Sequence, residues 1–163
     1  MKIFDTHAHL CSVSFDQDLE RVLAKASAAG VANIVAVGEN LADAEKNIQL
    51  AASYEQILPA AGLYPAILDM EQAAALQNFI RLHAKQLAAI GEVGLDFWAV
   101  QDKGAQELQR DIFAGFIDNI STPRPIKNGK ANRSPANSPQ IEIGIFFCLH
   151  AFTVISINFN TDG

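Results

Sequence analysis

Four apolar segments, each followed by a helical pattern, constrain the fold of the first 118 residues. The segment "NIVAVG" (33–38) is almost continuously apolar, which is typical of strands buried on both faces of a parallel sheet. We expect strands within 2–6, 33–38, 57–62 and 87–97, and helices over 16–29, 41–54, 69–86 and 105–118. Because the connections are short, the pattern predicts (βα)4 with right-handed crossovers. Half of a (β/α)8 barrel and an open doubly wound sheet both fit this α/β pattern.

The spacing of apolar residues predicts which side of each helix is buried. Positions i, i+3, i+4 and i+7 lie on one side of a helix. The apolar residues at such spacings are Leu19, Val22, Leu23 and Ala26 in the first helix, Leu76, Phe79 and Ile80 in the third, and Leu108, Ile112 and Phe113 in the fourth. We expect these residues to pack against the sheet.

The composition changes near residue 119. Residues 121–140 hold four of the six prolines and four basic residues, with no acidic residue and no apolar period. We therefore predict three parts: a half-barrel domain over 1–118, an irregular linker over 119–140, and an apolar tail over 141–163 that could form one or two strands. A (β/α)8 barrel typically needs about 250 residues. We expect this chain to leave a parallel edge strand unpaired and apolar surface exposed, which would favour association.

Charge and composition exclude several classes of protein. The net charge is −6, so the surface as a whole does not attract polyanions, and phosphate chemistry would need bound cations. The sequence has no apolar stretch of roughly 18 residues, so we expect no membrane-spanning helix. The N-terminal residues do not have the pattern of a signal peptide. The two cysteines, Cys11 and Cys148, are too few for a disulfide framework and favour a cytoplasmic location.

Two histidines follow the first predicted strand in "KIFDTHAHL" (2–10). On a strand, residues i and i+2 point the same way, with Cα atoms about 6.6–7 Å apart. His7 and His9 could therefore hold one ion at the carboxyl end of the sheet, where parallel α/β folds bind ligands. Two ligands do not complete a metal site, and the alternative of two half-exposed loop residues stays open.

A second candidate segment is "AIGEVGLDF" (89–97), in which Glu92 lies between Gly91 and Gly94. Glycines beside a carboxylate let the backbone bend and approach a ligand closely. Glu92, at the carboxyl end of its strand, could bridge two cations about 3.5–4 Å apart. The alternatives are a surface acid for Glu92 and a helix cap or solvated turn for Asp96.

Together, "FDTHAHL" (4–10) and "AIGEVGLDF" resemble the TatD family of metal-dependent deoxyribonucleases. "GLYP" (62–65) is similar to that family's Gly-Leu-His-Pro element, with Tyr64 in place of histidine. "AQELQRDIFAGFI" (105–117) resembles the helix after the fourth strand. The resemblance covers residues 1 to about 118 and implies part of a (β/α)8 TIM barrel of the metallo-dependent hydrolase kind.

The resemblance also implies roles for particular residues. His7 and His9 would hold one divalent ion, and Glu92 would bridge to a second. The ions would be Mg²⁺, Mn²⁺ or Zn²⁺, and an activated water would hydrolyse phosphodiester bonds in DNA, the implied substrate. Asp96 would support catalysis. His150 ends the apolar segment "FFCLHAF" (146–152) and would correspond to a sixth-strand ligand of the family.

The sequence departs from the family after residue 118. Residues 119–140 contain no histidine, so the fifth-strand ligand of the family is absent there, and Asp162 only loosely matches a seventh-strand acid. We expect a truncated or frame-shifted copy of a family member. Three alternatives remain: an inactive fragment with at most partial metal binding, a metallo-dependent amide or ester hydrolase, and a non-catalytic scaffold. The sequence does not predict the oligomeric state.

Overall fold

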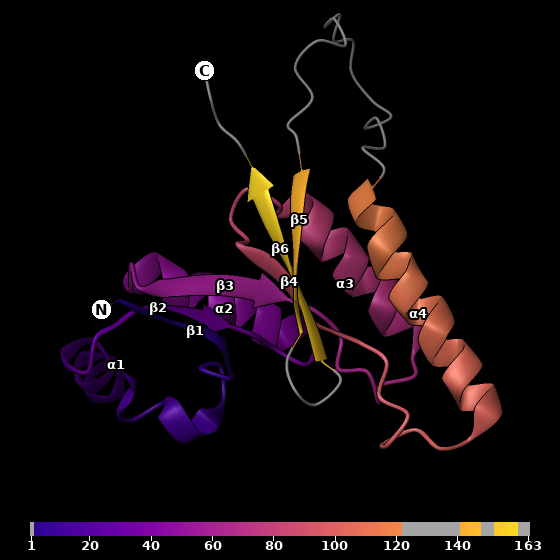
Figure 1. The fold of residues 1–163 in the computed structure, drawn as a ribbon, viewed down its shortest axis with the longest axis horizontal. Coiled ribbons are helices and arrows are strands. Elements are labelled where there is room, and N and C mark those ends of the chain that lie inside the picture. Colours follow the sequence, from indigo (N-terminus) through magenta and orange to yellow (C-terminus); the bar gives the residue numbers. More distant parts are fainter. Residues whose placement is uncertain (1, 122–140, 148–151, 160–163) are drawn as a thin grey trace, which may run out of the picture.

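The computed structural model describes residues 2–121, 141–147 and 152–159. Strands and helices alternate up to residue 121, and two further strands follow (Figure 1). Within these ranges, one sheet has the strand order β1-β2-β3-β4-β6-β5. Strands β1 to β4 pair in parallel with their neighbours. Strand β6 pairs antiparallel with both β4 and β5. The elements are β1 (Ile3–Ala8), a 3-10 turn (Val13–Phe15), α1 (Leu19–Ala28), β2 (Val31–Ala36), α2 (Leu41–Ser53), β3 (Ile57–Ala61), α3 (Met70–Leu82), β4 (Ala89–Gly94), α4 (Lys103–Ser121), β5 (Ile141–Phe147) and β6 (Phe152–Phe159).

The four predicted βα units are confirmed, and they form the half-barrel rather than an open doubly wound sheet. Strand β1 runs on to Ala8 and so includes His7, which the sequence had placed just beyond the strand. Helix α1 begins at Leu19 rather than at residue 16, because a 3-10 turn precedes it. Helix α4 continues to Ser121, past the predicted boundary at 118. The predicted linker lies mostly outside the described residues, so the division into linker and tail stays a prediction.

Polar side chains fix where two of the helices begin. Asn40 accepts a hydrogen bond from the Asp43 amide at the start of α2. Asp69 accepts hydrogen bonds from the amides of Gln72 and Glu71 at the start of α3, and these bonds lower the pKa of Asp69. Such caps satisfy amides that have no partner inside the helix.

The main hydrophobic core lies between the sheet and helices α3 and α4. Leu76 and Phe116 are buried from the helix side, and Ile90 and Val93 from β4. The predicted inward faces of α3 and α4 are confirmed: Ile80 and Ile112 are also buried, and Phe79, Leu108 and Phe113 pack against this core. A second cluster, under α1 and α2, contains Leu10, Leu23, Ile34 and Ile57. No helix in the described part of the chain is both long and apolar enough to span a membrane.

Among the described strands, the expected unpaired parallel edge lies at β1 and not at β4. The apolar tail forms two strands, and β6 pairs with β4 through Ala89↔Ser156 and Ile90↔Ile155. The backbone groups of β4 therefore find partners without a fifth parallel strand. Strand β1 lies at the other end of the sheet order, and Ile3 and Phe4 are exposed there.

The carboxyl ends of β2, β3 and β4 come unusually close together. The Glu92 amide donates to the Gly38 carbonyl at 3.3 Å, although β3 lies between β2 and β4 in the sheet. Gly62, just after β3, makes this approach possible. A Cβ atom there would lie 2.4 Å from the Glu92 carbonyl oxygen and 2.5 Å from the Gly91 carbonyl carbon. The absence of a side chain at residue 62 therefore helps to place Glu92.

We predict that Gly62→Ala destabilises the protein, because the added methyl group would overlap backbone atoms that have little room to move. The free energy of unfolding in urea should fall by about 1–3 kcal/mol, the range for overpacked sites. Gly104→Ala is the matched control. Its Cβ would meet only an Asp102 carboxylate oxygen at 3.3 Å, and alanine favours the helix there. Equal stability of Gly62→Ala and the wild type would contradict this packing.

Candidate metal centre

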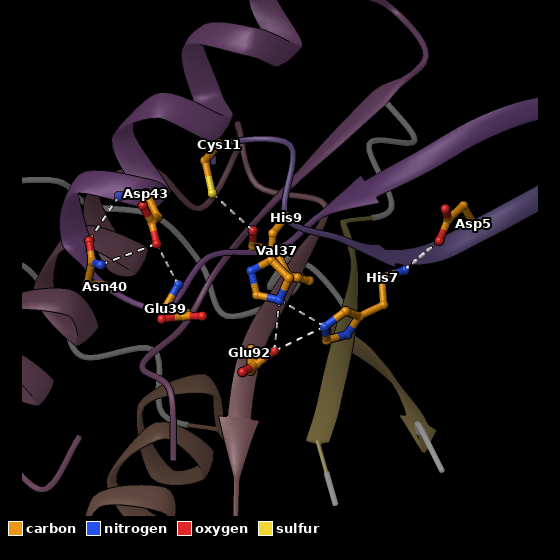
Figure 2. A network of polar contacts seen from close by, with 9 residues as sticks. All are labelled: Asp5, His7, His9, Cys11, Val37, Glu39, Asn40, Asp43 and Glu92. Carbon is orange, nitrogen blue, oxygen red and sulfur yellow. Dashed lines mark hydrogen bonds and ion pairs between the residues drawn. The ribbon is translucent and has the colours of Figure 1, made fainter. Parts of the chain in front are cut away.

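Three side chains converge at the carboxyl end of the sheet (Figure 2). The His7 Nε2 atom lies 3.0 Å from Glu92 Oε2, and the His9 Nε2 atom lies 3.5 Å from the same oxygen. The two Nε2 atoms are 3.3 Å apart. Within the described residues, these three side chains form the group of potential ligands close enough to hold one ion. The structure thus brings together the three residues that the sequence singled out, and their role as metal ligands stays a prediction.

A local irregularity in β1 helps to direct the histidines. Asp5 pairs with Ile34 and Ala8 with Ala36, so one extra residue is inserted in β1 between these pairs. Such a bulge locally re-aims a strand. The His7 amide donates to the Asp5 Oδ1 atom at 3.0 Å, so the Asp5 carboxylate is hydrogen-bonded to the backbone of β1. Asp5 therefore supports the backbone of His7 and is not a member of the three-residue group.

The curvature of the sheet brings Glu92 to the histidines. In a flat sheet, β1 and β4 would be separated by three interstrand spacings, or about 14 Å. The observed 3.0 Å between His7 and Glu92 requires the sheet to curl, as it does in a barrel. Strand β4 is also irregular between Ile90 and Val93, the stretch that contains Glu92. The site is therefore a product of the half-barrel fold.

The chemistry and spacing of the three groups fit a divalent cation. Glu92 is only 2% exposed, and a buried carboxylate is costly unless a cation or hydrogen bonds compensate it. Imidazole and carboxylate are zinc ligands, and donor atoms about 2.1 Å from one tetrahedral ion lie about 3.4 Å apart. The three observed separations are 3.0–3.5 Å. His7 and His9 are partly exposed, so the site is accessible from solvent.

A polar network holds the segment behind His9 (Figure 2). The Cys11 thiol donates to the Val37 carbonyl, with sulfur and oxygen 3.5 Å apart. Asp43 accepts from the Glu39 amide at 2.9 Å and from the Asn40 side chain at 3.2 Å. Burial, and then the negative charge of Asp43, raise the pKa of Cys11 to about 11. Cys11 is thus a buried, protonated thiol and does not belong to the group of ligands.

Asp96 lies apart from the three-residue group. It is buried, and its Oδ1 atom accepts hydrogen bonds from the amides of Trp98 and Ala99 at 3.0 and 2.9 Å. Asp96 therefore fixes a turn, but it is buried and not in the solvated turn that the sequence left open. A role for Asp96 in catalysis stays a prediction. His150 and Asp162, the other predicted residues of the site, lie outside the described residues.

Two residues near the site were given no role by the residue pattern. The Tyr64 amide donates to the Glu39 carbonyl at 2.9 Å, which joins the segments that follow β3 and β2. Burial, together with the carboxylates of Asp96, Glu92 and Glu39, raises the pKa of Tyr64. The sequence could have indicated that Glu39 lies near the site, because Glu39 is an acidic residue directly after a buried strand, at the edge of the sheet that carries the histidines.

The described residues thus form a half-barrel with a His-x-His pair and a buried glutamate at its carboxyl end. Residues 4–119 match the family described as TatD related DNase. The chain belongs to this family.

Two relatives illustrate the similarity. The uncharacterized metal-dependent hydrolase YabD of Bacillus subtilis is 37% identical over 118 residues, which cover 71% of this chain and 45% of YabD. The human deoxyribonuclease TATDN3 is 33% identical over 168 aligned positions, covering 92% of this chain and 60% of TATDN3. The chain therefore spans about half the length of these relatives.

A solved structure supports the same fold. The chain is similar to YjjV, a TatD homologue from Escherichia coli K12, with a TM-score of 0.63 and 26% sequence identity. The similarity covers 72% of this chain and 46% of YjjV. This agreement supports the half-barrel for the part of the chain that the family covers.

We predict that Cys11 alkylates slowly in the folded protein. With a pKa of about 11, compared with an ordinary value of 9.0, its thiolate is about 100-fold scarcer at pH 8. Iodoacetamide labelling, followed by mass spectrometry of the Cys11 peptide, should show slow modification that accelerates as pH rises toward 11 and on unfolding in urea. Asp43→Asn should speed labelling of the folded protein. Rapid labelling at pH 8 would contradict the buried, protonated thiol.

Proposed function

We propose that the protein is a divalent-metal-dependent hydrolase that cleaves phosphodiester bonds in DNA. The observation that carries the proposal is the convergence of His7, His9 and Glu92 on one point. Membership of the TatD family and the name of the human relative, a deoxyribonuclease, support the choice of DNA. The two-cysteine composition supports a cytoplasmic location as part of the same proposal.

In this proposal His7, His9 and Glu92 would hold a divalent ion, and Glu92 would also be the ligand shared with a second ion. A bound divalent ion lowers the pKa of water and stabilises negative charge on a phosphoryl oxygen. Mg²⁺, Mn²⁺ and Zn²⁺ are the candidates. Asp96 has a supporting role, because it fixes the segment that follows β4 through the amides of Trp98 and Ala99.

The charge of the chain supports a cationic cofactor. Residues 1–118 carry 16 acidic and 8 basic side chains. A phosphodiester would be repelled by this part of the chain, and its oxygens need positive charge nearby as the reaction proceeds. The carboxylates of Glu92 and Glu39 alone would oppose the binding of a phosphate group, whereas bound cations would reverse the local charge.

We predict that divalent ions stabilise the protein through the three ligands. At a free Zn²⁺ or Mn²⁺ concentration of 100 times Kd, binding should add about 2.7 kcal/mol to the free energy of unfolding. Thermal unfolding of the metal-stripped chain, with and without ion, measures this effect. His7→Ala and Glu92→Gln should lose most of the stabilisation. His83→Ala removes a histidine from the end of α3 and should keep it. Equal stabilisation of all variants would place the ion elsewhere.

We also predict metal-dependent cleavage of DNA. A labelled single-stranded oligonucleotide should be degraded with Mg²⁺, Mn²⁺ or Zn²⁺ and remain intact in EDTA. His7→Ala and Glu92→Gln should lower the rate at least about 100-fold, the scale on which one stabilising group contributes to catalysis. Gel analysis of products under each ion measures the activity.

The outcomes separate the alternatives. Activity that survives both substitutions would indicate another site or a contaminant and would contradict the proposal. Metal binding without cleavage would indicate an inactive fragment, since the chain spans only part of its relatives. Hydrolysis of an ester such as p-nitrophenyl acetate, with zinc and without DNA cleavage, would favour the amide or ester hydrolase.

A further inference from the structure

Two aromatic side chains are exposed on the loop between β4 and α4. Trp98 is 87% exposed and Phe97 is 39% exposed. The Arg110 guanidinium carbon, on α4, lies 4.8 Å from the centroid of the Phe97 ring. Val13 and Leu82 are also exposed, but single exposed aliphatic residues are common on protein surfaces. Adjacent exposed aromatic rings with a cation over one of them are a more specific feature.

The loop that carries these rings is fixed at its base by buried groups. Asp96 accepts the amides of Trp98 and Ala99, and the Asp96 amide donates to the Gln109 side chain at 3.0 Å. Gln109 is also buried and donates to the Pro65 carbonyl at 2.8 Å. The exposure of Trp98 is therefore set by an ordered turn that is anchored to α4 and to the segment after β3.

The loop lies at the edge of the sheet that carries the proposed metal centre. Glu92 is near the carboxyl end of β4, and Trp98 follows six residues later in the sequence. Six residues span at most about 20 Å. Single-strand binding sites commonly extend over about 4–16 nucleotides, which is enough to cover a distance of this order. A strand engaged at the metal centre could therefore reach Trp98.

We propose that Phe97, Trp98 and Arg110 form a stacking platform for the unpaired bases of single-stranded nucleic acid. The inference deepens the proposed function and rests on it for the choice of ligand. Aromatic rings and guanidinium planes stack on bases of any sequence, and each base so held contributes on the order of a 5- to 100-fold gain in affinity. Stacking is a source of affinity that does not need a basic surface, which this acidic chain lacks.

The wild-type chain contains its own probe, because Trp98 is the single tryptophan in the sequence. We would titrate the full chain in EDTA, which prevents cleavage, with a 12-nucleotide oligothymidylate and follow tryptophan emission. The matched probe is an abasic oligomer of the same length, which keeps the phosphates and lacks bases. We expect saturable quenching by oligothymidylate, with at least about fivefold weaker binding of the abasic oligomer and of a duplex.

Variants then assign the binding to the platform. With a dye-labelled oligothymidylate followed by fluorescence anisotropy, Trp98→Leu should weaken binding by about 5- to 100-fold, and Trp98→Phe should retain most of it. Trp98→Leu should keep the stabilisation by divalent ions, since the leucine variant leaves all three proposed ligands in place. His7→Ala should keep oligothymidylate binding in EDTA, because the platform does not need the metal.

Three results would overturn the platform: equal affinity for the abasic oligomer and oligothymidylate, unchanged affinity in Trp98→Leu, or no binding by the wild type. A change in sedimentation of Trp98→Leu with unchanged DNA affinity would assign the rings to a protein contact instead. Cleavage of DNA without base-dependent binding would refute the platform and leave the proposed function standing. Base-dependent binding without cleavage by the wild type would refute the function alone.

Discussion

The curl of the parallel sheet is the constraint on which the candidate site depends. Strands β1 and β4 are not neighbours, yet the side chains of His7 and Glu92 approach to 3.0 Å. This approach needs strand ends that converge, and the convergence needs a residue without a side chain at Gly62. The direct contact between the Glu92 amide and the Gly38 carbonyl shows how closely the ends meet. Backbone packing thus sets the position of a buried carboxylate.

The loops around the site are each fixed by an aspartate that accepts hydrogen bonds from backbone amides. Behind His9, Asp43 accepts the Glu39 amide and fixes the segment after β2. After β4, Asp96 accepts the amides of Trp98 and Ala99 and fixes the aromatic loop. Each carboxylate accepts hydrogen bonds from backbone amides in the loop that follows a strand, as aspartates commonly do in turns. The two aspartates order the segments around the site, at which His7, His9 and Glu92 converge.

The residue pattern predicted the four βα units and the three converging residues for physical reasons, whereas only the resemblance to the TatD family favoured the half-barrel over an open doubly wound sheet. Buried parallel strands are apolar throughout, and the helices repeat with a period near 3.6, so the four units were visible. His7 and His9 were found because their spacing matches a strand, and Glu92 because glycines flank it. The bulges in β1 and β4 were not predictable, since register shifts depend on the partner strand. The pairing of β6 with β4 was missed for the same reason, because long-range strand pairing leaves no local signal.

The central claim is that His7, His9 and Glu92 share one cation, and X-ray absorption at the zinc edge tests it most directly. In the zinc-loaded wild type we expect two imidazole nitrogens at about 2.0 Å and at least one oxygen ligand. The double variant His7→Ala, His9→Ala should lose the imidazole scattering. Identical imidazole scattering in the double variant and the wild type would show that zinc binds to other histidines, and would contradict the account.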